Sequence, residues 1–398
     1  MNSHPANFKP PIPANKHRHG SLLIPKGGWI PLVCVLLSTV VKSGQGHSGW
    51  APRHREIASG KAHGLGPASC RFFLWTASLI YGLGVRLRNF FYHCGLKKSV
   101  SVELPVVCVG NLTTGGTGKT PCVEWVARQL RSRGLRVALI SRGYGGTGGV
   151  NDEALVLENH LDDVPHLQGS NRAALCKTAL EELESEAIVL DDGFQHRQLA
   201  RDLDLVLIDA SNPWGYGHLL PRGLLREPVS GLRRAHAVII TRADHLNSND
   251  LASLKSRIQK LAPKALIAEA VHQPVELIRF NQPALALKEL EGKSVLAFCG
   301  LGNPEAFFKS LQHLGANVAH TLEFPDHHPY TREDMDAISH KARESNSPID
   351  WIVTTEKDLV KIRSEALEGC PLLALGISFE LRSGKESLEN LLARICQR

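Results

Sequence analysis

Residues 106–121 read VVCVGNLTTGGTGKTP, and this stretch decides the fold. An apolar run of strand length leads into a glycine-rich loop that ends in Gly118-Lys119-Thr120, and a helical pattern follows. In such a unit, backbone N–H groups cradle phosphates, the lysine reaches the β- and γ-phosphate oxygens, and the hydroxyl binds Mg²⁺. The loop departs from G-x-x-x-x-G-K-[ST] at its first position, where Thr113 stands for glycine. The pattern predicts a phosphate-binding loop for ATP and Mg²⁺.

Apolar runs rich in β-branched residues recur on both sides of this loop. They are separated by helical stretches such as 120–132 and 171–184, and they lie at 105–110, 136–141, 187–192, 203–209, 236–241 and 265–271. A second set begins near Gly292, with strands at 294–300, 317–324 and 350–355 and helices at 305–314 and 332–344. Continuous apolar strands that alternate with helices indicate a parallel sheet covered on both faces. We predict an α/β fold: a P-loop NTPase core with a mostly parallel sheet flanked by helices, a smaller C-terminal α/β lobe, and an N-terminal amphipathic helix.

The first hundred residues differ from the rest in charge. They contain a single acid, Glu56, among many Lys and Arg residues, whereas the whole chain has a net charge of +7. A basic front segment on an acidic body favours targeting or a membrane surface, and we predict no nucleic-acid partner. Residues 1–69 are rich in Pro, Gly, His and Ser, which predicts a targeting peptide or a disordered extension.

The segment 71–98 reads RFFLWTASLIYGLGVRLRNFFYHCGLKK. A basic, aromatic-rich helix suits a membrane surface, although a helix packed on the protein's own core would show the same pattern. No continuous stretch reaches the roughly 20 apolar residues that a spanning helix needs. The predicted division is therefore an extension at 1–69, an amphipathic helix at 70–100, the P-loop core at 101–271, a connector at 272–292 and the C-terminal lobe at 293–398.

A second chemical signal closes the strand AIVLD. Asp191 and Asp192 follow four apolar residues, and Gln195 and His196 come directly after them. Carboxylates in this place can hold Mg²⁺ directly or through water. Asp-Asp-Gly is also good turn chemistry, so a simple strand-end turn is the alternative.

The order and spacing of several motifs resemble those of the tetraacyldisaccharide 4′-kinases. The motifs are VGNLTTGGTGKTP, SRGYGG (141–146), NDEALVL (151–157), LDDGFQHR (190–197), LLPRGLLREP (219–228), FPDHHPY (324–330) and TEKD (355–358). That family also carries Thr or Ser at the first loop position, so Thr113 agrees with the resemblance. The resemblance covers roughly residues 70–398. It implies transfer of the γ-phosphoryl group of ATP to the 4′-hydroxyl of an acylated glucosamine disaccharide 1-phosphate, at a membrane bound peripherally through residues 71–98.

The resemblance also implies roles for individual residues. Asp152 would act with His327 as the base for the sugar hydroxyl, with His328 one position away as the alternative. The catalytic set would be Asp152, His327, Lys119, Asp191, Gln195 and His196. The metal would be held by Thr120, Glu153 and Asp192. The nucleotide would be bound by Thr113, Thr114, Gly115, Gly116, Thr117, Gly118, Lys119, Thr120, Arg172 and Arg222.

Arginine suits phosphate because its planar fork can donate two hydrogen bonds at once. Four arginines are candidate anion contacts: Arg142, Arg172, Arg222 and Arg226. The tetrapeptide TRAD at 241–244 resembles a guanine-reading motif but has Arg in place of Lys, so adenine is expected.

Two other hypotheses for the function compete with the kinase hypothesis. One is a P-loop GTPase or metal-insertion chaperone, and the other is a catalytically inactive membrane-bound protein. No obligate protein partner is evident in the sequence. The basic, acid-poor front segment predicts a mitochondrial location ahead of a plastid one.

Overall fold

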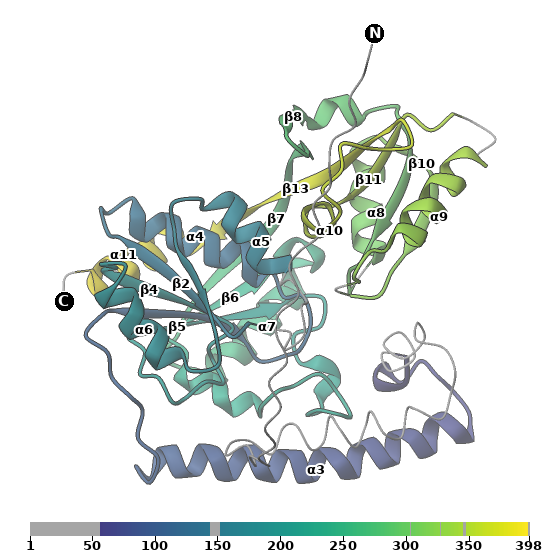
Figure 1. Cartoon of the computed structure of the whole chain (residues 1–398). Helices are drawn as coiled ribbons and strands as arrows, with labels where there is room; N and C mark the ends of the chain where they lie inside the picture. Colours follow the sequence, from purple (N-terminus) through teal and green to yellow (C-terminus); the bar gives the residue numbers. More distant parts are fainter. Residues whose placement is uncertain (1–55, 144–151, 303, 327, 345–347, 397–398) are drawn as a thin grey trace, which may run out of the picture. The chain divides into compact units, whose positions relative to one another are not determined.

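The computed structural model describes residues 56–143, 152–302, 304–326, 328–344 and 348–396. The described part of the chain forms one sheet of 13 strands in the order β10-β9-β11-β13-β7-β6-β5-β1-β4-β2-β3, with β8 and β12 paired beside it. Figure 1 gives the arrangement of the elements. The strands are β1 (Val106–Asn111), β2 (Val137–Ser141), β3 (His166–Gln168), β4 (Ala187–Asp191), β5 (Leu203–Asp209), β6 (Ala237–Thr241), β7 (Leu266–Arg279), β8 (Gln282–Ala286), β9 (Ser294–Cys299), β10 (Asn317–Glu323), β11 (Trp351–Thr355), β12 (Ala366–Leu367) and β13 (Cys370–Ser383).

The central strands are buried on both faces, as their continuous apolar sequences require. Successive residues of a strand point to opposite faces, so Val106 and Cys108 of β1 join one hydrophobic core and Val107 and Val109 join the other. Helices α6 (Arg172–Glu181) and α7 (Ser248–Leu261) cover the first face, and α4 (Lys119–Arg131) and α5 (Asp152–His160) cover the second. The predicted α/β fold is confirmed.

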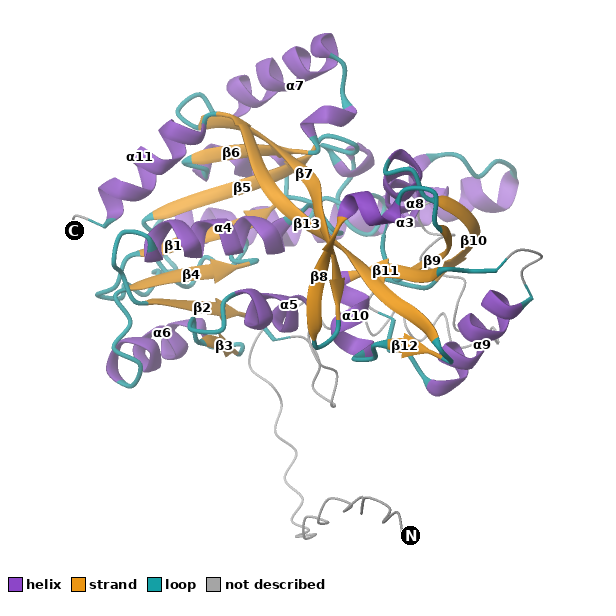
Figure 2. Cartoon of the chain, turned by 90° about the horizontal axis from the view of Figure 1, so that it is seen from above, coloured by secondary structure: helices purple, strands orange, loops and turns teal. Residues whose placement is uncertain are grey.

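The long strands β7 and β13 carry the sheet from the core into the second lobe. β7 is parallel to β6 over Leu266–Glu269 and antiparallel to β13 over most of its length. Figure 2 shows this ribbon where the two halves of the sheet meet. The segment 272–292, predicted as a connector, therefore holds the second half of β7, then β8.

The second lobe has its own two-sided core. Helix α8 (Pro304–His313) packs on one face of β9 and β11, while α9 (Arg332–Arg343) and α10 (Glu356–Ile362) pack on the other. The last helix, α11 (Lys385–Ile395), places Leu388 and Leu392 in the P-loop core beside α4. The C-terminal residues of the predicted lobe 293–398 thus complete the hydrophobic core of the first lobe.

Helix α3 (Leu65–His93) is fixed to the core by its polar and small residues. The Tyr81 hydroxyl donates to the carbonyl of Arg226 at 2.7 Å, and Arg197 donates to the carbonyl of Asn89 at 3.1 Å. Among the described residues, α3 is the one helix whose length and mean hydropathy (1.2) would allow it to cross a membrane, with 22% of that window buried. The sequence predicts no spanning segment, because no run of α3 is continuously apolar although its mean hydropathy is high enough.

Candidate active site

The phosphate loop joins β1 to α4 at the carboxyl edge of the parallel strands, where ligands bind in open α/β sheets. Gly115 and Gly118 have φ angles of 107° and 80°, which residues other than glycine rarely adopt. A Cβ on Gly118 would also lie 2.4 Å from Nε2 of His272 in β7. Lys119 and Thr120 begin α4 and are 8% and 5% exposed. The loop therefore has the open backbone and the helix N-terminus that phosphate binding needs.

Three side chains outside residues 113–120 hold the loop in place. The Asn111 amide donates to Thr117 Oγ1 at 2.8 Å, and the Thr241 hydroxyl donates to the carbonyl of Thr117 at 2.9 Å. Arg242 donates to the carbonyl of Gly116 at 3.1 Å and pairs with Asp209. The TRAD sequence at 241–244 does not itself indicate that β6 ends beside the phosphate loop, so these contacts could not be predicted.

The acidic pair lies beside the loop lysine. Lys119 Nζ is 3.8 Å from Asp192 Oδ1, and Arg226 Nη1 is 2.7 Å from both carboxylate oxygens of Asp192. Arg172 is 3% exposed and donates to the main-chain carbonyls of Asp191 and Asp192. Two of the candidate arginines, Arg172 and Arg226, thus hold the Asp-Asp turn.

Asp191 fits a metal site better than an ordinary turn. Its side chain is 4% exposed, and Oδ1 is buried without a hydrogen-bond partner among the described residues. Burial and the nearby charge of Glu153 raise the pKa of this carboxyl above its usual range. Together with the Thr120 hydroxyl and the Asp192 carboxylate, this oxygen would supply the hard-oxygen donors that suit Mg²⁺. The described residues contain no group of three or more His, Cys, Asp or Glu arranged for a metal, so phosphate oxygens or water would have to complete the site.

Gln195 and His196 occupy the turn after the acidic pair. The Gln195 amide donates to the carbonyl of Asn111 at 2.8 Å and to Glu227 Oε1 at 3.0 Å. Glu227 is fully buried and also accepts from Arg234 at 2.9 Å. Burial, followed by the charges of Arg172 and nearby arginines, lowers the pKa of His196 to about 4, so its imidazole is neutral at pH 7.

Asp152 and Glu153 begin α5 and face the second lobe. Glu153 Oε1 accepts from Lys357 Nζ at 2.6 Å, and Asp152 Oδ2 is 3.6 Å from Lys361 Nζ. Both lysines belong to α10, about two hundred residues further along the chain. Nothing in the motifs of α5 indicated these partners, because the contacts depend on how the lobes dock.

His327 lies outside the described residues, and its neighbour His328 is held by its own lobe. His328 Nε2 is 2.9 Å from Asp334 Oδ2, and its ring stacks on Phe324 with centroids 4.9 Å apart. The carbonyl of His328 accepts from Lys361 at 3.1 Å.

The other two candidate arginines, Arg142 and Arg222, have different surroundings. Arg142 is exposed, and its charge acts on Arg172 and His196. Arg222 donates to the carbonyl of Ala58 at 2.8 Å, beside the start of the α3 region.

A histidine joins the two lobes near the site. His160 Nδ1 lies 2.7 Å from Glu124 Oε2 of α4, and Nε2 lies 2.5 Å from Glu356 Oε1 of α10. Hydrogen bonds to Glu124 and Glu356 raise the pKa of His160 to about 10. Because the pKa of His160 is higher in the folded state than in the unfolded state, protonation of His160 stabilises the fold. This stabilisation is fully present below pH 6.5 and is lost as the pH rises through about 10.

We expect His160→Gln to lower the free energy of unfolding by on the order of 2 kcal/mol at about pH 6, a value reduced for partial exposure of the ring. At about pH 10.5 the two proteins should differ little, because the wild-type imidazole is then neutral as well. Urea unfolding across this pH range measures the difference. A loss of stability that is the same at every pH would contradict the charged bridge.

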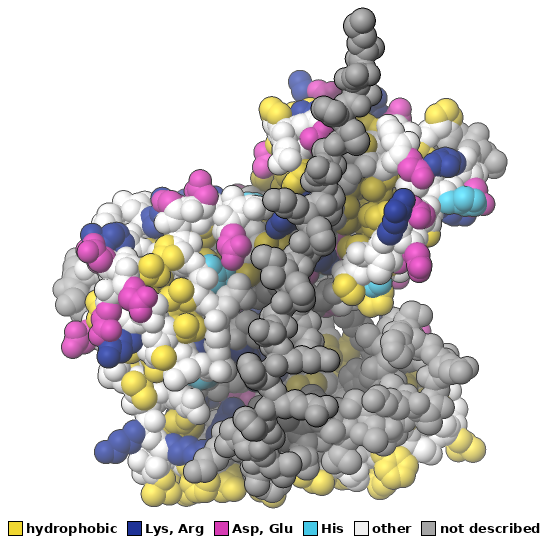
Figure 3. Space-filling view, in the orientation of Figure 1, with side chains coloured by type: hydrophobic (Ala, Val, Ile, Leu, Met, Phe, Trp, Pro, Cys, Tyr) yellow, Lys and Arg dark blue, Asp and Glu magenta, His cyan; other side chains and the backbone are white. Residues whose placement is uncertain are grey.

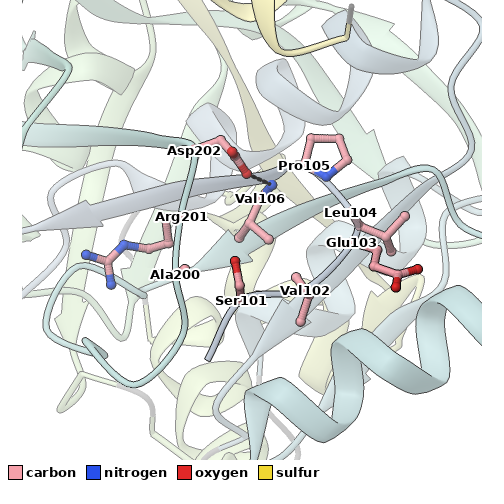
Figure 4. Close-up of a pocket in the computed structure, with 9 residues that line it drawn as sticks. All are labelled: Ser101, Val102, Glu103, Leu104, Pro105, Val106, Ala200, Arg201 and Asp202. Atoms are coloured by element: carbon pink, nitrogen blue, oxygen red, sulfur yellow. Dashed lines mark hydrogen bonds between the residues drawn. The ribbon is translucent and has the colours of Figure 1, made fainter. Parts of the chain in front are cut away.

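The described chain also has a pocket of about 230 Å³ away from the phosphate loop. It is lined by Ser101–Val106 and Ala200–Asp202, and the Asp202 carboxylate accepts from Val106 N across it at 2.9 Å (Figure 4). This pocket lies at the amino end of β1, at the opposite end of that strand from Lys119. We therefore place the active site at the phosphate loop.

Comparisons with known proteins identify the family of this chain. The sequence model of the family described as "Tetraacyldisaccharide-1-P 4'-kinase" matches residues 70–397. A tetraacyldisaccharide 4′-kinase of Anaeromyxobacter dehalogenans (strain 2CP-C) is 42% identical, over 77% of this chain and 86% of that protein. One from Halothermothrix orenii is 39% identical, over 78% and 89%. The crystal structure of LpxK from Aquifex aeolicus with ATP has a TM-score of 0.64 and 29% identity, and the match covers 82% of this chain and 99% of that one.

These relatives are bacterial, so the predicted mitochondrial location is wrong, and they give no support to an organellar form of the enzyme. The prediction rested on the basic, acid-poor composition of the front segment. Composition of this kind is shared by targeting peptides and by other basic extensions, so it could not identify an organelle.

Proposed function

Because the chain belongs to the tetraacyldisaccharide 4′-kinase family, we propose that the site around Lys119 transfers the γ-phosphoryl group of ATP to the 4′-hydroxyl of an acylated glucosamine disaccharide 1-phosphate. The observation that carries this proposal is the gathering of phosphate loop, acidic turn and α5 carboxylates at one edge of the sheet. Membership of this family favours the kinase over the two alternative hypotheses, a P-loop GTPase or metal-insertion chaperone and a catalytically inactive membrane-bound protein.

The nucleotide end of the reaction needs alignment and charge neutralisation more than covalent help. The backbone N–H groups of the loop and the ammonium of Lys119 would hold the β- and γ-phosphates. Lys119 is already directed at the acidic turn, since Nζ lies 3.8 Å from Asp192 Oδ1. A γ-phosphate bound there would lie within reach of both the loop and the turn.

Mg²⁺ would be held by the Thr120 hydroxyl and the carboxylates of Asp192 and Glu153, with the buried Asp191 carboxylate behind them. When bound, the ion neutralises charge that develops on the phosphate oxygens. Glu153 is now paired with Lys357 at 2.6 Å. The oxygen donors of this set suit Mg²⁺ more than a softer metal.

Asp152 and His327 would form the base for the sugar hydroxyl. The 4′-hydroxyl proton passes to this pair as the 4′-oxygen bonds to the γ-phosphorus, and the bond from that phosphorus to the β,γ-bridging oxygen breaks to release ADP. We assign the imidazole role to His327 because His328 is bound to Asp334 and stacked on Phe324. A carboxylate that fixes the imidazole tautomer makes the imidazole a better base.

The lipid substrate would reach the site from a membrane surface on which α3 lies. The side chains of α3 that are exposed and apolar are Leu65, Phe72, Phe73, Trp75, Leu79, Ile80, Leu83, Leu87 and Phe90. Figure 3 shows hydrophobic side chains gathered along the edge of the molecule where α3 runs. Its other face is tied to the core at Arg226, the same residue whose guanidinium pairs with Asp192. An apolar face of this size with arginines beside it suits the boundary between headgroups and acyl chains.

We expect replacement of Phe72, Phe73 and Ile80 by serine to weaken binding to vesicles of anionic phospholipid at least about tenfold. The three side chains are 61%, 70% and 74% exposed, so the fold should tolerate the change. Sedimentation with vesicles measures the binding. The matched control is Val275→Ser with Ile377→Ser, two exposed apolar residues on β7 and β13 that should leave binding unchanged. Equal loss in the control would contradict a membrane face on α3.

The full chain tests the reaction directly. Purified protein, γ-labelled ATP and tetraacyldisaccharide 1-phosphate in detergent micelles should give label in the lipid, with label at the 4′ position. Hydrolysis of ATP without labelled lipid would retain the phosphate loop and reject the substrate.

A further inference from the structure

We propose that Lys361 is a positioning residue of the phosphoryl-transfer reaction, which fixes Asp152 relative to the loop that follows Pro325. This inference rests on the role proposed above for Asp152. It concerns a residue of the TEKD helix that belongs to none of the predicted catalytic, nucleotide or metal sets.

The ammonium of Lys361 lies at the meeting point of three segments. Nζ is 3.1 Å from the carbonyl of His328, 3.0 Å from Asp358 Oδ1 and 3.6 Å from Asp152 Oδ2. The ammonium donates one hydrogen bond to the carbonyl of His328, and the carboxylates of Asp358 and Asp152 both lie within ion-pair distance of it. One cation therefore joins α5 of the core to α10 and the 324–330 loop of the second lobe.

The surroundings of Lys361 favour a fixed geometry over a loose surface pair. Its side chain is 13% exposed, and those of Asp152 and Asp358 are 6% and 0% exposed. The ring of Tyr330 lies 5.1 Å from Nζ, which adds a cation–π contact. Ion pairs on exposed surfaces contribute little, but a buried cation with several oxygen partners cannot leave one without cost.

The anchor of the ammonium is itself fixed to the second lobe. Asp358 Oδ2 accepts from Gly300 N at 2.9 Å and from the Thr355 hydroxyl at 2.7 Å. These bonds tie the start of α10 to the end of β9. A shift of the second lobe would therefore move Lys361, and Asp152 would lose the charge beside it.

A positioning role of this kind should act on catalysis and leave nucleotide binding unchanged. Lys361 contacts no residue of the phosphate loop in the described chain, so ATP should bind normally without it. A misplaced base lowers the rate of the chemical step, and a shift of about 1 Å can cost about a hundredfold. We expect Lys361→Met to lower kcat about 10- to 100-fold, with both KM values within about threefold of the wild type.

The experiment is a double-mutant cycle on the full chain with the lipid kinase assay. Lys361→Met, Asp152→Asn and the double variant are compared with Lys309→Met, a control at a lysine on α8 that is 67% exposed. If Lys361 acts through Asp152, the double variant should be no slower than Asp152→Asn alone, within about threefold. Lys361→Arg should recover part of the lost kcat, because it keeps the charge but changes the geometry.

Two results would overturn the proposal: a kcat for Lys361→Met within about threefold of the wild type, or additive losses in the double variant. Lys361→Gln can still donate to the carbonyl of His328 and is measured in parallel. We expect it to lose kcat to a similar extent, so it replaces Lys361→Met in the test if that variant does not fold. Full activity of Asp152→Asn would instead reject the proposed base. Loss of activity in Asp152→Asn with none in the folded Lys361 variants would reject the positioning role alone.

Discussion

Lys119→Met is expected to lower kcat for lipid phosphorylation by about a thousandfold or more. Lys119 is the first residue of α4, where the partial positive charge of the helix N-terminus adds to that of the ammonium. Its ammonium lies at the end of the phosphate loop, and methionine keeps a similar volume while removing the charge. The measurement is label transfer from γ-labelled ATP, with enzyme in excess so that a residual rate can be detected.

The same variant should retain its fold. Asp192, the partner of Lys119, keeps its two contacts with Arg226 at 2.7 Å, so removing the lysine leaves Asp192 paired. The melting temperature should therefore change by only a few degrees. Lys177→Met serves as the control. Lys177 on α6 is 70% exposed, and in the described part of the chain its ammonium pairs only with Glu181. A Lys119 variant with more than about a tenth of the wild-type kcat would contradict the role assigned to its charge.

The strands and the phosphate loop of the core could be predicted because their signals are local. A strand buried on both faces must be apolar throughout, and the sequence shows this for β1, β2, β4 and β6. The positive φ angles of the loop need glycine, and the glycines stand at those positions. Each of these requirements is met within a few residues of sequence.

The contacts between lobes could not be predicted, because they depend on the docking of distant segments. The partners of Asp152 and Glu153 come from α10, and the bridge from His160 to Glu356 joins the same two helices. Helix α11 also returns to the first lobe although its sequence follows the second. The periodicity and spacing of apolar residues do not indicate which lobe an amphipathic helix will cover.

Arginine function shows a second limit of the sequence. Arg172 and Arg226 were predicted as anion contacts because guanidinium suits phosphate, and both are found holding the Asp191–Asp192 turn. Arginine side chains bind main-chain carbonyls, carboxylates and phosphates with the same donors. The choice between these partners depends on burial, which the motif does not reveal. Contact of Arg172 with the nucleotide remains a prediction, as does contact of Arg226 with an anion.

Asp152→Asn is expected to lower kcat by about a thousandfold, since general-base catalysis contributes about 10²- to 10⁴-fold. Asparagine cannot accept the proton of the sugar hydroxyl or hold the charge of a protonated imidazole. The KM for ATP should stay within about threefold of the wild type, because the phosphate loop is unchanged. Steady-state kinetics with both substrates varied measures the two effects.

The fold should accept this substitution at the helix start. Asp152 Oδ1 accepts a hydrogen bond from Glu153 N at 3.0 Å, and the amide oxygen of asparagine can accept the same bond. The control is Asp163→Asn, which removes an exposed carboxylate paired with Arg131 and should keep wild-type kcat. If Asp152→Asn keeps more than about a tenth of the wild-type kcat, the proton leaves the 4′-hydroxyl by another route. A loss confined to kcat, with lipid and ATP still bound, would show that Asp152 acts in the chemical step and not in substrate binding.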